Sequence, residues 1–169
     1  MPIAWIEQPL FPGYTVKALG EEDIPAVLAL CQSNPLFYEH CPPPPTAENI
    51  REDMQILPEG KGPEDKFYVG FWDGKKLTAV LDLIRGFPDE RTAYIGFFMV
   101  DASVSGQGEG SRLVEEICAC LRTEFTKARL GYARGNPQSE HFWRKNGFVP
   151  TGVVVSKDTY DAVVMEKKL

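Results

Sequence analysis

Apolar residues recur along the chain with two spacings, and these predict where helices and strands lie. Apolar residues three and four positions apart indicate helices at 20–34 and 112–125, and capping signals indicate two more at 46–57 and 137–146. Runs rich in β-branched and aromatic residues predict strands at 14–19, 66–72, 77–84, 92–100, 130–133, 148–156 and 161–167. Asp73-Gly74 between two of these runs predicts a hairpin. The predicted element order is β α α β β β α β α β β.

Length, hydrophobic content, net charge and cysteine positions limit the kinds of protein that this chain can be. With 169 residues, 43% of them hydrophobic, the chain can bury one sizeable core, which predicts a single domain over 1–169. A net charge of −6 argues against nucleic acid as a main partner. No apolar run approaches the roughly 20 residues that span a bilayer, and the first residues show no signal-peptide pattern, so we expect a cytoplasmic protein without membrane contact. Cys118 and Cys120 point to different helix faces, and no metal site is expected.

A glycine-rich segment, 100–111, lies between a predicted strand and a predicted helix. Gly106, Gly108 and Gly110 alternate there, which lets the backbone turn tightly and expose successive N–H groups. The N-terminus of the helix directs its own free N–H groups to the same place, so a phosphate or pyrophosphate is the favoured ligand. The alternative is a flexible turn. A nucleotide-hydrolysing P-loop is disfavoured because no Lys-Ser or Lys-Thr follows the glycines, and a Rossmann domain because antiparallel hairpins precede them.

A second motif follows the glycines further along the chain and changes this interpretation. It consists of Asn136, Ser139, Phe142, Trp143, Lys145, Gly147 and Phe148. Together with Ser105, Gly108 and Gly110, this motif resembles the GNAT superfamily of acyl-CoA-dependent N-acetyltransferases. The resemblance implies an α+β fold of the GNAT type, with a central mixed, mostly antiparallel sheet of about seven strands flanked by helices.

The resemblance also implies the parts that bind acetyl-CoA. The pyrophosphate would be held by the backbone of Ser105, Gly106, Gln107, Gly108, Glu109, Gly110 and Ser111. The pantetheine arm would pair with the backbone of Phe98, Met99 and Val100. The backbone N–H near Phe98 or Met99 would support the thioester oxygen, and Gly96 would mark the bulge that opens the slot. Asn136, Ser139, Phe142 and Trp143 would contact the pantetheine. Asn136 can equally be an ordinary helix cap, and the two aromatic residues can be plain core.

Two departures from the family pattern affect the expected chemistry. Ser105 replaces the usual Arg or Gln, which predicts weaker CoA binding. Trp143 stands where many members have a Tyr that protonates the departing thiolate, and an indole cannot act as that acid. Tyr132 or water is the candidate for this role.

The general base is also missing from its usual place, because the strand at 92–100 contains no acid and no His. Asp82, on the neighbouring predicted strand, and Glu39, in the connector before 46, are the candidates. Asp82 facing solvent on a half-exposed strand is the alternative.

These residues lead to one functional hypothesis and one rival. The first is an N-acyltransferase that moves an acetyl group from acetyl-CoA to a primary amine, on a small molecule or a peptide, by direct transfer in a ternary complex. The rival is a catalytically weak or silent acyl-CoA-binding sensor or scaffold, which the missing acid and Trp143 favour. The sequence leaves open the identity of the acceptor and whether the chain forms a homodimer.

Overall fold

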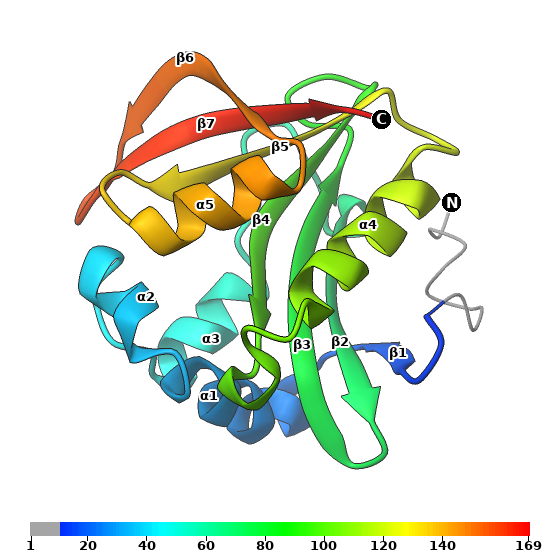
Figure 1. Cartoon of the computed structure of the whole chain (residues 1–169), viewed down its shortest axis with the longest axis vertical. Helices are drawn as coiled ribbons and strands as arrows, with labels where there is room; N and C mark the ends of the chain where they lie inside the picture. The colour runs from blue at the N-terminus through cyan, green and yellow to red at the C-terminus, as the bar shows by residue number, and fades with distance from the viewer. Residues whose placement is uncertain (1–10) are drawn as a thin grey trace.

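The computed structural model describes residues 11–169, which form one seven-stranded sheet with helices on both faces (Figure 1). The spatial order of the strands is β1-β2-β3-β4-β5-β7-β6. The strands are β1 Thr15–Ala18, β2 Lys66–Asp73, β3 Lys76–Arg85, β4 Thr92–Val100, β5 Lys127–Ala133, β6 Val149–Ser156 and β7 Asp161–Lys168. The helices are α1 Ile24–Gln32, α2 Pro35–His40, α3 Ala47–Asp53, α4 Glu109–Leu121 and α5 Pro137–Lys145.

Pairing between β4 and β5 is parallel, whereas the other neighbouring strands pair antiparallel. The parallel register runs from Thr92 opposite Lys127 to Ile95 opposite Leu130 and stops there. Beyond this point the two strands diverge, as Figure 1 shows. The sheet is therefore open at its centre, on the side where β4 leads into the glycine-rich segment.

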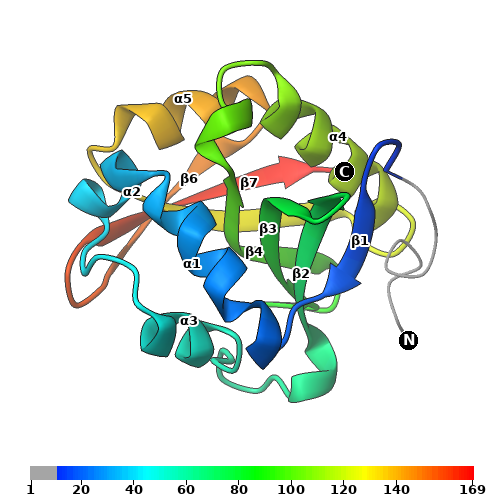
Figure 2. The ribbon, with the colours of Figure 1, turned by 90° about the horizontal axis from the view of Figure 1, so that it is seen from below.

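Two hydrophobic cores stabilise the sheet, one on each face. The core beneath α4 and α5 includes Leu81, Leu83, Ile117, Leu130 and Phe148. The core beneath α1 and α3 includes Val27, Leu30, Ile50, Val80 and Met99. Figure 2 shows α1, α2 and α3 on one side of the sheet and α4 and α5 on the other. Consecutive residues of β3 belong to different cores, so this strand is buried on both faces.

Every predicted element is present in the structure, but strand β5 begins at Lys127, three residues before its predicted start, and three helices differ from the prediction. Helix α2 is not predicted from the sequence, because Asn34-Pro35 is interpreted only as the end of α1. Proline also suits the first turn of a helix, and in the structure Pro35 is the first residue of α2. Helix α3 ends at Asp53, four residues before its predicted end, and the amides of Gln55 and Ile56 close its last turn on the carbonyl of Glu52. Helix α4 begins at Glu109 within the glycine-rich segment. The predicted hairpin joins β2 and β3.

Membrane-spanning helices and clustered metal ligands are both absent from the described part of the chain. None of the helices in residues 11–169 is long and apolar enough to cross a membrane. Within the same residues, no group of three or more His, Cys, Asp or Glu side chains is arranged to hold a metal ion.

Candidate active site

A bulge in β4 accompanies the opening between β4 and β5. The register of β3 against β4 places Asp82 opposite Phe97 and Leu83 opposite Ile95, so Gly96 has no partner. The bulge expected at Gly96 is therefore present. A bulge increases local twist and redirects the strand, and this one lies where the pairing of β4 with β5 stops.

The end of β4 turns part of its backbone toward the opening. The amide of Asp101 donates to the carbonyl of Thr78 on β3, whereas the carbonyl of Val100 accepts a hydrogen bond from Asn34 Nδ2 at 3.0 Å, away from β3. Because backbone polar groups alternate sides along a strand, the N–H and C=O of Phe98 face the same edge as those of Val100. Met99 directs its backbone toward β3. Of the three residues predicted to pair with pantetheine, Phe98 and Val100 thus face the opening.

The glycine-rich segment has the backbone geometry that a turn into α4 requires. Gly106 and Gly108 have φ values of 78° and 79°, in the left-handed region that favours glycine, and Gly108 caps α4. Gly110 differs: it is buried, and a Cβ there would lie 3.2 Å from the ring of Phe142. The first two glycines therefore serve the turn, whereas Gly110 allows α4 and α5 to pack closely.

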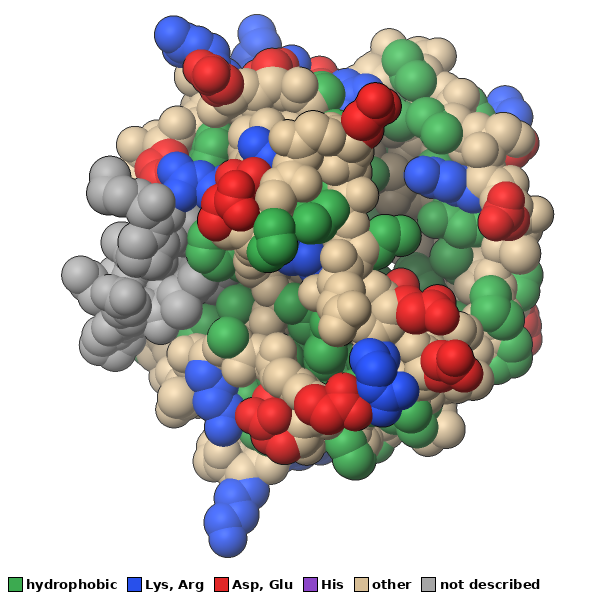
Figure 3. All heavy atoms as spheres, turned by 180° about the vertical axis from the view of Figure 1, so that it is seen from behind, with side chains coloured by type: hydrophobic (Ala, Val, Ile, Leu, Met, Phe, Trp, Pro, Cys, Tyr) green, Lys and Arg blue, Asp and Glu red, His purple; other side chains and the backbone are tan. Residues whose placement is uncertain are grey.

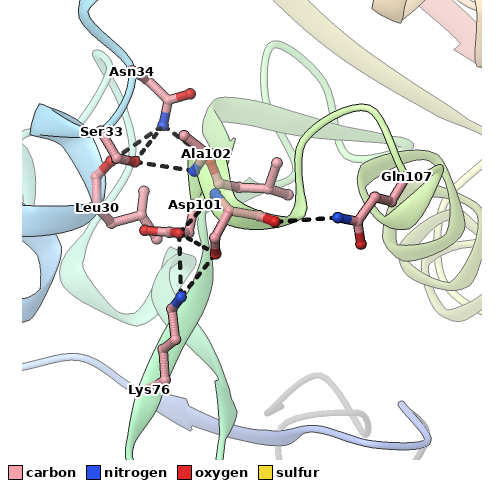
Figure 4. A network of polar contacts seen from close by, with 9 residues as sticks. Leu30, Ser33, Asn34, Lys76, Asp101, Ala102 and Gln107 are labelled. Carbon is pink, nitrogen blue, oxygen red and sulfur yellow. Dashed lines mark hydrogen bonds and ion pairs between the residues drawn. The ribbon is translucent and has the colours of Figure 1, made fainter.

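A hydrogen-bond network fixes the entrance of this segment to α1 and β3 (Figure 4). The hydroxyl of Ser33 accepts from the amide of Ala102 at 3.1 Å, next to the contact of Asn34 with Val100. From β3, Lys76 Nζ donates to the hydroxyl of Ser103 at 2.7 Å. The loop after β4 is thus held at several points before it reaches the glycines.

Aromatic side chains from β4 and α5 meet beside the opening. Phe98 and Phe142 stack, with ring centroids 6.2 Å apart and an interplanar angle of 16°. Trp143 packs edge to face against Phe142 and Phe148. Trp143 is buried and belongs to the core, whereas Phe142 is only partly buried. Phe142 therefore keeps part of its ring available to a ligand.

Asn136 is buried and caps α5. Its Oδ1 accepts hydrogen bonds from the amides of Gln138 and Ser139, at 3.1 and 3.2 Å. The ordinary helix-cap role considered for this residue is therefore present. Because Oδ1 is already used, the Nδ2 group is the part of Asn136 that remains suited to a ligand carbonyl.

A cavity of about 710 Å³ lies on the face of the sheet covered by α2 and α3, and it reaches the opening between β4 and β5. One face of the molecule is hollowed, with hydrophobic side chains along the walls of the hollow (Figure 3). Phe98, Ser139 and Trp143 line the cavity at the opening, and Asp53, Lys66 and Asp82 are also among its lining residues. A volume of this size suits a small molecule.

Asp82 is buried in the wall of this cavity, with 7% of its surface exposed. The alternative that it faces solvent is wrong. Lys66 Nζ lies 3.1 Å from Oδ2 and also donates to the carbonyl of Ile56, while Oδ1 has no hydrogen-bond partner among residues 11–169. Burial raises the pKa of the Asp82 carboxyl, and Lys66 opposes that rise. A buried carboxylate with one free oxygen and a raised pKa is a suitable proton acceptor.

Asp53, at the end of α3, is a second acid of the cavity and was not predicted from the sequence. The residue is exposed to solvent and is one of those that line the cavity. Desolvation raises the pKa of Asp53 from 3.8 to about 6, and the negative charge of Asp82 acts in the same direction. Asp53 lies three residues after the buried Ile50, and this spacing is the sequence signal that it shares the inward face of the helix.

The other two candidates for proton transfer lie in different places. Tyr132 on β5 is buried and lines the cavity, and burial raises the pKa of its hydroxyl. Glu39 on α2 is exposed and does not line the cavity. The structure therefore brings Asp82 and Tyr132 together in one cavity and leaves Glu39 outside it.

A comparison of the sequence with models of known protein families leads to the same family as the strand order, the glycine turn and the opening. Residues 29–148 match the model of the acetyltransferase (GNAT) family. This chain belongs to the GNAT acetyltransferase family. No curated protein matches the sequence significantly.

Solved structures share the fold of this GNAT chain at low sequence identity. An acetyltransferase from Thermus thermophilus superposes with a TM-score of 0.73 at 18% identity, covering 92% of this chain and 97% of that protein. A Salmonella typhimurium acetyltransferase that modifies the N-terminal serine of ribosomal protein L7/L12 gives 0.71 at 19%, with coverages of 95% and 98%. AAC(6′)-Ib in complex with ribostamycin and coenzyme A gives 0.70 at 19%, with coverages of 92% and 93%. At these identities the likeness shows the fold.

Proposed function

We propose that this GNAT protein transfers an acetyl group from acetyl-CoA to a primary amine by direct transfer in a ternary complex. The observation that carries the proposal is the opening between β4 and β5, which is continuous with a cavity that contains a buried carboxylate. The thioester and the amine can thus approach each other from opposite faces of the sheet.

Acetyl-CoA binding rests on backbone groups. The N–H groups of 105–111 and the N-terminus of α4 hold the pyrophosphate. The pantetheine arm lies in the opening, where it pairs with the backbone of Phe98 and Val100 as an added strand would. Asn136 Nδ2 donates to a pantetheine carbonyl, and Phe142 packs against the arm. The neighbouring structure of AAC(6′)-Ib, which contains coenzyme A, supports this assignment of a CoA site to the fold.

The transfer step follows from the groups that meet at the opening. The amine nitrogen attacks the carbonyl carbon of the thioester, and the N–H of Phe98 donates to the oxygen as negative charge develops on it. Asp82 accepts the proton that the nitrogen loses. The carbon–sulfur bond then breaks, and the CoA thiolate leaves and takes a proton from Tyr132 or from water. Trp143 has no part in this proton transfer, because its indole N–H is not acidic enough near neutral pH.

Two measurements test this function. The first is the melting temperature with and without acetyl-CoA: ligand at about a hundred times its dissociation constant stabilises the native state by about 2.7 kcal/mol. The second is CoA release across a panel of amines, with the Asp82→Asn variant as the control. Amine-dependent CoA release that falls in this variant supports the proposal. A melting shift without CoA release from any amine would instead favour an acyl-CoA-binding sensor or scaffold, and the absence of both would reject the CoA site.

A further inference from the structure

The charged side chains that line the cavity sum to a net negative charge. Lys66 and Asp82 form an ion pair and neutralise each other. Glu52, Asp53 and Lys157 also line the cavity, and within residues 11–169 none of the three forms an ion pair. Three carboxylates against two lysines give the cavity lining about one net negative charge when Asp53 is ionised. A single cation is the ligand that this charge would attract.

Aromatic side chains from several helices and strands line the cavity that contains Asp53. They include Phe37, Tyr38, Tyr68, Tyr94, Phe97 and Tyr160. Several of them, including Phe37, Tyr94 and Phe97, are only partly buried. Rings attract both apolar groups, which gain by leaving water, and cations placed over their faces.

The cavity is also bounded by two segments that are distant in sequence but joined in space. Thr159, in the turn between β6 and β7, donates to the carbonyl of Pro42 at 2.6 Å. Beside this contact, the hydroxyl of Tyr160 is hydrogen-bonded to the thiol of Cys41. These contacts hold the turn against the segment between α2 and α3. They limit the room for an extended chain, while the volume of about 710 Å³ remains ample for a compact molecule.

From these observations we infer that the acceptor is a compact primary monoamine with an aromatic body, and that Asp53 binds its ammonium group. This inference rests on the proposed N-acetyltransferase function and names the acceptor class of the same site. A polyamine carries two or more ammonium groups, which is more positive charge than the one net negative charge of the cavity lining would balance. A peptide would have to bury main-chain polar groups among aromatic side chains, which is costly unless each is hydrogen-bonded.

Binding of amines is measured by calorimetry on the full chain saturated with CoA, so that no turnover occurs. The probes are 2-phenylethylamine, spermidine and tetra-alanine. We expect 2-phenylethylamine to bind at least about tenfold more tightly than the other two, a difference of about 1.4 kcal/mol. Asp53→Asn should weaken its binding about tenfold or more. Glu48→Gln removes the same charge from an exposed position on α3 outside the cavity, and should leave binding unchanged.

A comparison of ligands tests the ammonium contact without any variant. On the unmodified protein, 2-phenylethanol keeps the ring and lacks the charge, so it should bind about tenfold more weakly than 2-phenylethylamine. Equal binding of the alcohol and the amine, equal or tighter binding of spermidine or tetra-alanine, or unchanged binding in a folded Asp53→Asn variant would each overturn the inference.

The two proposals fail in different ways. Selective binding of 2-phenylethylamine without CoA release in the presence of acetyl-CoA would support the acceptor site and overturn the transferase function. Efficient acetylation of spermidine or tetra-alanine, with poor binding of the aromatic amine, would support the transferase function and overturn the inferred acceptor class.

Discussion

The carboxylate of Asp82 occupies the space that a side chain at position 96 would fill. A Cβ atom added to Gly96 would lie 2.9 Å from Asp82 Oδ2, and Gly96 is the bulged residue of β4. An acid on β3 thus reaches the point where β4 turns away from β5. Under the proposed mechanism, Asp82 supplies from the neighbouring strand the carboxylate that β4 itself lacks.

Replacing Gly96 with Ala should disturb this arrangement. The new methyl group would push the buried carboxylate of Asp82 aside, so we expect CoA release to fall by about tenfold or more, whereas acetyl-CoA should still raise the melting temperature. Gly20→Ala is the matched control, because its Cβ would also lie 2.9 Å from a carboxylate oxygen, that of Glu22, at the surface. Full activity in Gly96→Ala would show that the close contact is not needed.

Asp82→Asn keeps the shape of the side chain and removes its ability to accept a proton. General base catalysis typically contributes about 10²- to 10⁴-fold to the rate, so kcat should fall within that range. The rise in melting temperature caused by acetyl-CoA should persist, because Asp82 is not among the residues proposed to bind the cofactor. A loss of the melting shift together with activity would point to a folding defect instead.

The Lys66→Met variant tests whether Asp82 is the general base, through the pH dependence of kcat/KM. The positive charge of Lys66 favours ionised Asp82 and opposes the effect of burial, so its removal should raise the pKa of Asp82 further. In a plot of kcat/KM against pH, the acidic limb, where activity falls as Asp82 becomes protonated, should then move to higher pH. Lys76→Met, which removes a surface lysine paired with Asp101, should leave the limb in place. A limb that stays unchanged in Lys66→Met would exclude Asp82 as the base.

The glycine turn can be tested with two substitutions that strain the backbone equally. Gly108 and Gly60 have φ values of 79° and 85°, and a Cβ at either would meet no atom within 4 Å. Valine at each position should therefore cost about 1–2 kcal/mol of stability. We expect Gly108→Val to lose the melting shift caused by acetyl-CoA and Gly60→Val to keep it. Retention of the shift in both variants would reject the turn as the pyrophosphate site.

Asp53 should also lower the stability of the protein at neutral pH. Its pKa is about 6 in the folded protein against 3.8 as the ordinary value, so the folded state disfavours the ionised form. This cost is absent below about pH 4, grows as the pH rises through about 6, and is fully present above it. The melting temperature of Asp53→Asn relative to the unmodified protein should therefore increase from pH 4 to pH 7. Glu48→Gln should show no such trend.

Local features of the sequence determined most of the fold. The hairpin at Asp73-Gly74, the cap at Thr46 and the strand at Thr92–Val100 follow from turn chemistry, side-chain hydrogen bonds and apolar runs, all of which act over a few residues. The glycine turn and the aromatic motif were visible for the same reason. Helix α2 was missed because proline can end one helix and begin the next, and the local sequence does not distinguish the two.

Tertiary structure decided the chemistry of the cavity. From Leu77 to Ile84 every residue of β3 is buried, so no alternation of polar and apolar positions could show which face Asp82 occupies. Its contact with Lys66 depends on the register of β3 against β2, and the pKa of Asp53 depends on the approach of α3 to that pair. Burial and Coulomb interactions act through space, between segments that the chain brings together only when it folds.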